Sequence, residues 1–83
     1  MNKYKMRIRI KNHSTFWEYS FEASDHNYAL NHIDAIKSGG FTNVNSSGSV
    51  EYFAPSDIAY MQLSPVGDTP PFENKYPAKK VLP

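Results

Sequence analysis

Three histidines, together with Ser24 and Asp25, have side chains that could carry out nucleophilic or acid–base chemistry. Ser24, Asp25 and His26 include the residue types of a catalytic triad, but adjacent residues cannot form its nucleophile–base–orienter chain. His26 and His32 do not have the i, i+4 spacing of a zinc pair, and His13 falls in a polar loop. Cysteine is absent, which excludes thiolate nucleophiles, zinc–thiolate sites and disulfides. We therefore expect no catalytic centre, metal site or cofactor, and a protein that is not an enzyme.

Cations alternate with apolar residues near the start of the chain, in the segment KYKMRIRIK at positions 3–11. An uninterrupted period of two is typical of a strand with one buried and one solvated side. The charged side holds the candidate partner-binding residues Lys3, Lys5, Arg7, Arg9 and Lys11. Such a row could bind phosphates or an acidic protein surface, or it could be the solvated side of a strand that lysine protects from aggregation.

A second alternating segment, residues 16–23, predicts an antiparallel partner for the first strand. Its apolar side holds Trp17, Tyr19, Phe21 and Ala23, and its other side holds Phe16, Glu18, Ser20 and Glu22. Phe16 thus falls on the charged side, where a large aromatic ring could anchor a partner. We add Phe16 to the candidate binding residues.

The length of the loop between these strands decides which cations meet the carboxylates of Glu18 and Glu22. A two-residue loop would place Arg9 and Lys5 opposite them, whereas a four-residue loop would place Lys11 and Arg7 there. Facing opposite charges contribute about 0.2–1 kcal/mol for each pair. In both registers the second strand neutralises part of the cationic row.

A helix is predicted at residues 26–38, with Ser24 or Asp25 as its N-cap and the Gly39-Gly40 pair at its end. Its apolar stripe consists of Ala29, Leu30, Ile33 and Ile36. Weaker strand signals follow at 41–45, 50–54 and 58–63. The order β-β-α-β-β predicts a single small α+β domain, in which one helix packs on one face of an antiparallel sheet of four to five strands.

Prolines mark the predicted end of the compact domain. Five of the six prolines follow residue 64, so residues 1–64 are expected to form the α+β domain and residues 65–83 an extended, proline-rich tail.

Composition limits the classes of partner. The 83 residues carry a net charge of +1, too close to neutral for a general polyanion binder and far from the acidity of a DNA mimic. The sequence shows neither an apolar run long enough to span a membrane nor a signal-peptide core. We expect a cytoplasmic monomer or weak homodimer that binds a partner protein or, as the alternative, binds nucleic acid through its basic first strand.

Three segments carry a resemblance to known proteins: KMRIRIK, WEYSFEASDHNYALNHI and VEYFAPSDIAYMQL. In size and strand–helix pattern, residues 3–64 resemble small accessory proteins of phages and mobile elements, among them anti-CRISPR proteins. The resemblance implies a non-enzymatic inhibitor that docks on a host protein complex, such as a CRISPR–Cas effector, in the bacterial cytoplasm and blocks its nucleic-acid channel or a subunit contact. Many such proteins imitate DNA with acidic faces. This chain departs from that pattern with its charge of +1, which favours steric occlusion or binding to an acidic protein surface.

Overall fold

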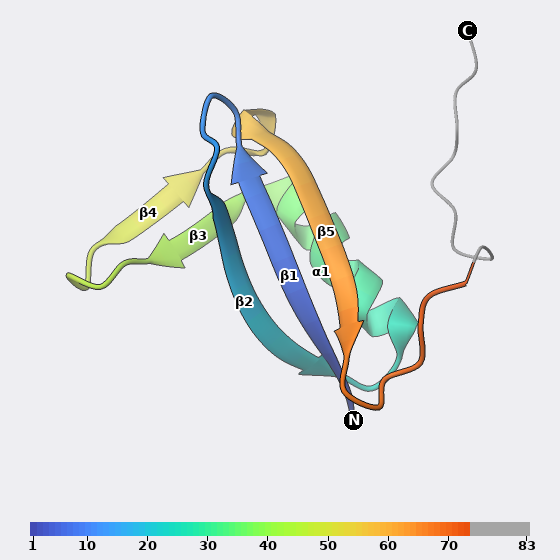
Figure 1. Cartoon of the computed structure of the whole chain (residues 1–83). Helices are drawn as coiled ribbons and strands as arrows, with labels where there is room; N and C mark the ends of the chain where they lie inside the picture. The colour runs from blue at the N-terminus through green and yellow to red at the C-terminus, as the bar shows by residue number, and fades with distance from the viewer. Residues whose placement is uncertain (74–83) are drawn as a thin grey trace, which may run out of the picture.

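One helix lies against one face of a three-stranded antiparallel sheet, and a separate two-stranded hairpin projects from one end of this pair (Figure 1). The computed structural model describes residues 1–73. Its elements are β1 (Asn2–Ile10), β2 (Phe16–Ala23), α1 (His26–Gly39), β3 (Phe41–Val44), β4 (Val50–Phe53), the 3-10 helix η1 (Pro55–Asp57) and β5 (Ile58–Val66). The predicted α+β class and the order β-β-α-β-β are confirmed, with β5 as the fifth strand.

The five strands divide between two sheets, with order β2-β1-β5 in the first and β3-β4 in the second. The first strand of the chain is therefore the central strand of the larger sheet. Its two neighbours come from opposite ends of the described chain, and β1 pairs antiparallel with both. Central strands are covered on both edges, so β1 is fixed in place by its neighbours in the sheet.

The β1–β2 register differs from both predicted registers. Arg9 lies opposite Phe16, which places Arg7 opposite Glu18 and Lys3 opposite Glu22. The connection is longer than expected because a turn forms directly after β1. In this turn the His13 N–H donates to the Ile10 carbonyl at 3.1 Å, and the next residues before Phe16 stay outside the strand. The parity of the pairing was predicted correctly, so the side chains of both strands lie on the expected sides of the sheet. Two cations still face the two carboxylates.

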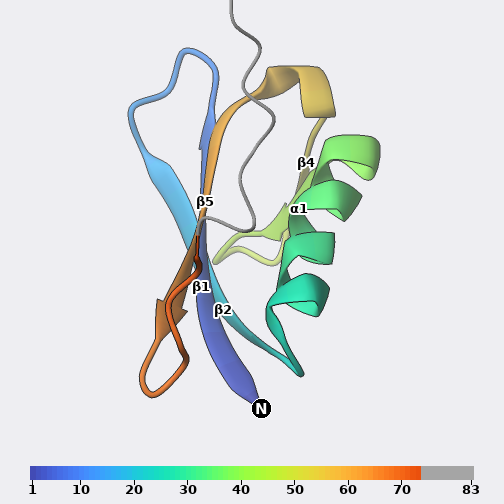
Figure 2. The same cartoon turned by 90° about the vertical axis from the view of Figure 1, so that its right-hand side faces the viewer.

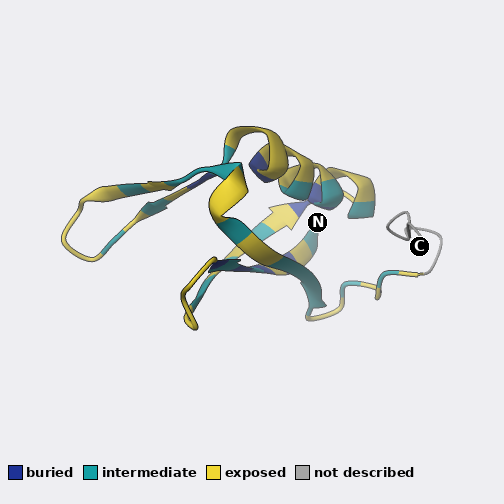
Figure 3. Ribbon diagram, turned by 90° about the horizontal axis from the view of Figure 1, so that it is seen from above, coloured by how far each residue is buried: buried dark blue, intermediate teal, exposed yellow. Residues whose placement is uncertain are grey.

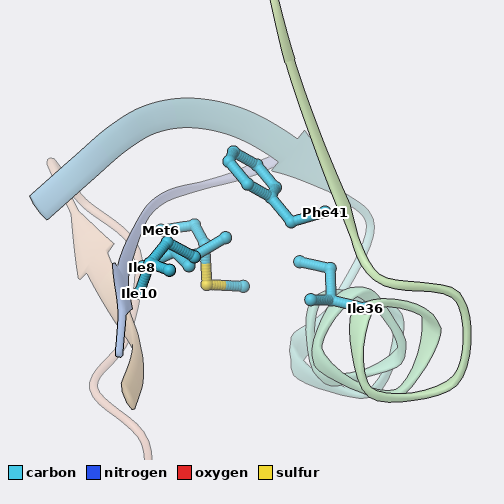
Figure 4. Packing of buried hydrophobic residues seen from close by; sticks show 5 residues of the cluster. All are labelled: Met6, Ile8, Ile10, Ile36 and Phe41. Carbon is cyan, nitrogen blue, oxygen red and sulfur yellow. The ribbon is translucent and has the colours of Figure 1, made fainter. Parts of the chain in front are cut away.

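The apolar side of β1 forms the centre of the core. Tyr4, Met6 and Ile8 are 0% exposed, and Ile10 is 5% exposed. Figure 4 shows the side chains of Met6, Ile8 and Ile10 directed toward Ile36 of α1 and Phe41 of β3. The prediction that this side of the first strand is buried under the helix is confirmed.

Asp25 fixes the start of α1. Its Oδ1 accepts a hydrogen bond from the Tyr28 N–H at 3.0 Å, as expected of an N-cap residue. Ala29 and Ile36 are buried against the sheet, while Tyr28 on the outer side is 63% exposed. At the other end, the Gly40 N–H donates to the Ile36 carbonyl at 2.8 Å, and Gly40 adopts a φ of +86°. The helix thus ends at the glycine pair that the sequence indicates.

The β3–β4 hairpin, hereafter the arm, extends away from both the sheet and the helix (Figure 3). Aromatic rings attach its base: Phe53 lies 5.1 Å from Trp17, and Phe41 lies 5.9 Å from Tyr19, measured between ring centroids. Farther out, Val44 and Val50 face each other across the arm and are 65% and 66% exposed. Only the base of the arm is therefore packed on the body of the protein.

The last strand continues past the predicted domain boundary. β5 runs to Val66, and Pro65 lies opposite Tyr4. Proline is tolerated there because β5 is an edge strand whose outer N–H groups have no ladder partner to lose. Beyond β5, Thr69 Oγ1 accepts a hydrogen bond from the Lys3 N–H at 2.7 Å, and Phe72 stacks on His26 at 4.2 Å. Residues 65–73 of the predicted tail thus contact the folded unit, and residues 74–83 lie outside the described residues.

Candidate binding face

The side of the larger sheet opposite α1 is the open face of the protein. Figure 2 shows the helix on one side of this sheet and no other helix or strand of the described chain on the other. Along β1 it carries the cation row, Lys3, Lys5, Arg7 and Arg9. On β2, the partners of this row are Glu22, Ser20, Glu18 and Phe16. On β5 they are Val66, Ser64, Gln62 and Tyr60.

Five of the six predicted binding residues lie on this face. Lys3 and Lys5 are exposed, whereas Arg7, Arg9 and Phe16 are half-buried. The sixth, Lys11, is exposed but lies in the turn after β1, where its N–H donates to the Asp57 carbonyl at 2.8 Å. The cation row is therefore one residue shorter than the sequence pattern suggested.

Arg7 lies across the face and contacts both outer strands. Its Nε is 2.9 Å from Glu18 Oε1, in an ion pair whose N–H is not directed at the oxygen, and its Nη1 donates to Gln62 Oε1 at 3.4 Å. Its guanidinium carbon lies 4.1 Å from the centre of the Phe16 ring. A cation over an aromatic ring contributes roughly 0.5–1 kcal/mol at an exposed site. These contacts hold the arginine in one orientation before any partner arrives.

Phe16 and Tyr60 meet over the same end of the face, although they come from the two outer strands. Their ring centroids are 5.9 Å apart and the ring planes are at 79°, an edge-to-face arrangement. Arg9 on the central strand is the Cα register partner of both residues. Arg7, Arg9, Phe16 and Tyr60 thus form an arginine–aromatic cluster at one end of the cation row.

Sequence reasoning found Phe16 but missed Tyr60. Within β5, Tyr60 and Gln62 alternate with Met61 and Leu63, and the latter two pack against the core. This alternation could have placed Tyr60 on the open face. It did not, because Ile58, two residues before Tyr60, also packs against the core, and strict alternation would put Tyr60 on the same side as Ile58.

The three histidines occupy separate places, as expected. His13 lies 6.0 Å from the Trp17 ring, and His32 stacks on Phe21 at 4.0 Å. Nδ1 of His26 lies 2.7 Å from the hydroxyl of buried Tyr4. Within the described residues there is no group of three or more histidine, cysteine or acidic side chains that could hold a metal ion.

A groove lies between α1, β2 and the arm. This groove has a volume of about 390 Å³, and Tyr19, His32, Ile36 and Phe41 are among its lining residues. Burial raises the pKa of the Tyr19 hydroxyl above its ordinary value of 10.0, so Tyr19 is neutral at physiological pH. The groove offers aromatic packing and one imidazole, without a paired acid or base to complete a catalytic grouping.

The chain has no match among protein families, curated proteins or solved structures. In the part of the chain that the structure describes, no helix has the length and apolar character needed to cross a membrane. The open face is therefore the feature from which a function can be inferred. Chemically, it can form charge-assisted hydrogen bonds to anionic groups and bury an apolar group against Phe16 and Tyr60.

Proposed function

We propose that this protein is a non-enzymatic binding module that docks on a partner protein through its open face. The arginine–aromatic cluster is the observation that carries the proposal. Arginine and aromatic residues are the types that most often supply the binding energy at the centre of protein interfaces. Here Arg7 is already oriented by Phe16, Glu18 and Gln62, which lowers the entropic cost of fixing it in a complex. Lys3 and Lys5 extend the charged surface away from the cluster.

The resemblance to anti-CRISPR proteins supports a partner in a bacterial defence system. In this proposal the protein acts in the host cytoplasm and occupies a surface that a nuclease complex, such as a CRISPR–Cas effector, needs for nucleic acid or for another subunit. Inhibition would be stoichiometric and steric. An acidic surface on the partner would match the cation row, and electrostatic attraction would accelerate the encounter.

Nucleic-acid binding is the second candidate, and one observation favours it. Phe16 and Tyr60 lie on the charged side of the sheet, so cations and rings occur together, as on many sheets that bind single strands. Against it, Glu18 and Glu22 border the cation row on β2, where they would repel phosphates. The mixed charge of the face suits a protein surface better than a polyanion.

Charge reversal on the open face is expected to abolish partner binding while the fold is retained. The variant carries Lys5→Glu and Arg9→Glu, which leaves the Arg7–Glu18 pair in place. We expect its affinity for the partner to fall about 100-fold or more, because hot-spot residues at the centre of an interface each contribute about 2 kcal/mol or more. The measurement is a pull-down from bacterial lysate with the tagged protein, followed by titration of the retained partner with each variant.

The matched control carries Lys11→Glu and Lys37→Glu, which changes the net charge equally but leaves the open face intact. Full binding by the control and loss by the test variant support the proposal, whereas equal binding by both contradicts it. Titration of single-stranded DNA and RNA at two salt concentrations tests the second candidate. A steep loss of affinity with salt would support it, because phosphate contacts release counterions, and no binding at low salt would remove it.

A further inference from the structure

The two sides of the cation row differ in charge. On the β2 side, Glu22 and Glu18 lie directly opposite Lys3 and Arg7. On the β5 side, the partners of the row are Val66, Ser64, Gln62 and Tyr60, none of which carries a carboxylate. The open face is therefore electrostatically asymmetric: among the strand residues that pair with the cation row, carboxylates occur only on β2.

This asymmetry selects a path for an anionic ligand. Neighbouring strands lie about 4.8 Å apart, so a chain placed over β1 and β5 is farther from the β2 carboxylates by roughly one strand spacing. One strand spacing is shorter than the Debye length of about 8 Å at physiological salt, so salt screens this difference only partly. An anionic segment is thus favoured over the β1–β5 side of the row.

The spacing of the row selects an extended conformation. Alternate residues of a strand are separated by about 6.6 Å, and the same repeat relates alternate side chains of an extended peptide. Acidic residues at every second position could therefore lie over the four cations of the row in turn. At the Arg9 end, Tyr60 is 44% exposed and offers a surface for an apolar side chain.

We propose that the β1–β5 side of the row binds an extended acidic segment of the partner protein, with acidic residues at alternate positions and an aromatic residue at the end next to Tyr60. This inference rests on the proposed function and adds the chemistry of the partner. A protein segment fits better than a single-stranded nucleic acid, because the Phe16 ring already contacts Arg7 and Tyr60 and is only half-exposed. Stacking platforms for bases need accessible ring faces.

A matched pair of serines provides the test. Ser20 on β2 and Ser64 on β5 both lie opposite Lys5, on its two sides. Replacing each by glutamate introduces the same charge on the same face of the sheet. Only Ser64→Glu places that charge on the β1–β5 side of the row, next to the proposed path. Ser20→Glu adds it to the border that already carries Glu18 and Glu22.

The probe is a fluorescein-labelled peptide with glutamate at every second position and a tryptophan at one end, titrated with the full chain in an anisotropy assay. We expect Ser64→Glu to weaken binding about fivefold and Ser20→Glu to weaken it less than about twofold, since a facing like charge is unfavourable by up to about 1 kcal/mol. A peptide with the same composition but contiguous glutamates should bind more weakly than the alternating one.

Equal effects of the two serine substitutions, or equal binding of the two peptides, would overturn the inference. Tighter binding of a single-stranded oligonucleotide of equal charge would also overturn it and favour the nucleic-acid reading. Each of these results is distinguishable from failure of the proposed function. That function requires only that Lys5→Glu with Arg9→Glu releases the partner captured from lysate.

Discussion

Replacing Gly40 by alanine is expected to destabilise the protein by about 3 kcal/mol or more, because a side chain at this position has neither the backbone freedom nor the space it needs. Gly40 has a φ of +86°, and an added Cβ would lie 2.5 Å from the Phe53 carbonyl oxygen and 2.6 Å from the Tyr52 hydroxyl. That hydroxyl donates to the Gly39 carbonyl at 2.8 Å, so the arm closes tightly over the end of α1. The substitution should lift the base of the arm away from the helix.

Urea denaturation followed by fluorescence measures this effect. Trp17 is the only tryptophan in the chain and packs on Phe53 in the arm, so its emission reports both global unfolding and release of the arm. The matched control is Gly39→Ala. An added Cβ at Gly39 meets nothing within 4 Å, and this helical position should gain stability from alanine, by about 0.5–1 kcal/mol. Equal stability of the two variants would contradict the tight junction described here.

Replacing Ile8 by alanine is expected to cost about 2–5 kcal/mol, through lost burial and the cavity left behind. Ile8 is 0% exposed and lies on the central strand, so its neighbours on both sides are also held in the sheet and cannot easily close the gap. A domain of this length has a total stability of only about 4–12 kcal/mol. The variant should therefore lose a large part of its stability and unfold at a temperature at least about 10 °C lower.

Thermal unfolding by circular dichroism, with Val50→Ala as the control, provides the comparison. Val50 is 66% exposed at the outer part of the arm, so its truncation removes apolar atoms that already contact water. We expect that variant to unfold within a few degrees of the unmodified protein. An Ile8→Ala protein as stable as Val50→Ala would mean that the core does not form around the centre of β1.

Local patterns predicted the elements whose side chains have a regular environment. β1 and β2 alternate strictly because one side of the sheet meets α1 and the other meets water. Asp25 was a good N-cap candidate because its short side chain reaches the free N–H groups of the first turn. The Gly39-Gly40 pair was predicted at the end of the helix because a left-handed conformation there disfavours residues with a Cβ, and Gly40 adopts the positive φ.

The division into two sheets could not be predicted in this way. Strand periodicity shows which residues share a side, but it does not say which strands are neighbours. The register shift opposite Arg9 and Ile10 shows the same limit. It allows Ile58 to face the core and Tyr60, of the same parity, to face the open side. The length of the loop after β1 was predicted incorrectly because Asn12 adopts a φ of +67°. Asparagine tolerates this conformation, but its presence in a sequence does not predict it.

The candidate face was predicted on β1 and β2, where the cations and Phe16 follow from parity alone. Its β5 side was not, because that side depends on a pairing between residues far apart in the sequence, such as Lys3 and Val66. The charge asymmetry of the face is therefore a property of the tertiary structure. No single segment of the sequence contains it.

The central position of β1 also determines when the protein can fold during its synthesis. The ribosome releases β1 first, yet one of its two flanking strands, β5, is the last to be made among the described elements. Until then the nascent chain holds an incomplete two-stranded ribbon, with Met6 and Ile8 lacking the neighbours Leu63 and Met61. Such distant pairings slow folding. We therefore expect the final structure to form only after β5 has been synthesised.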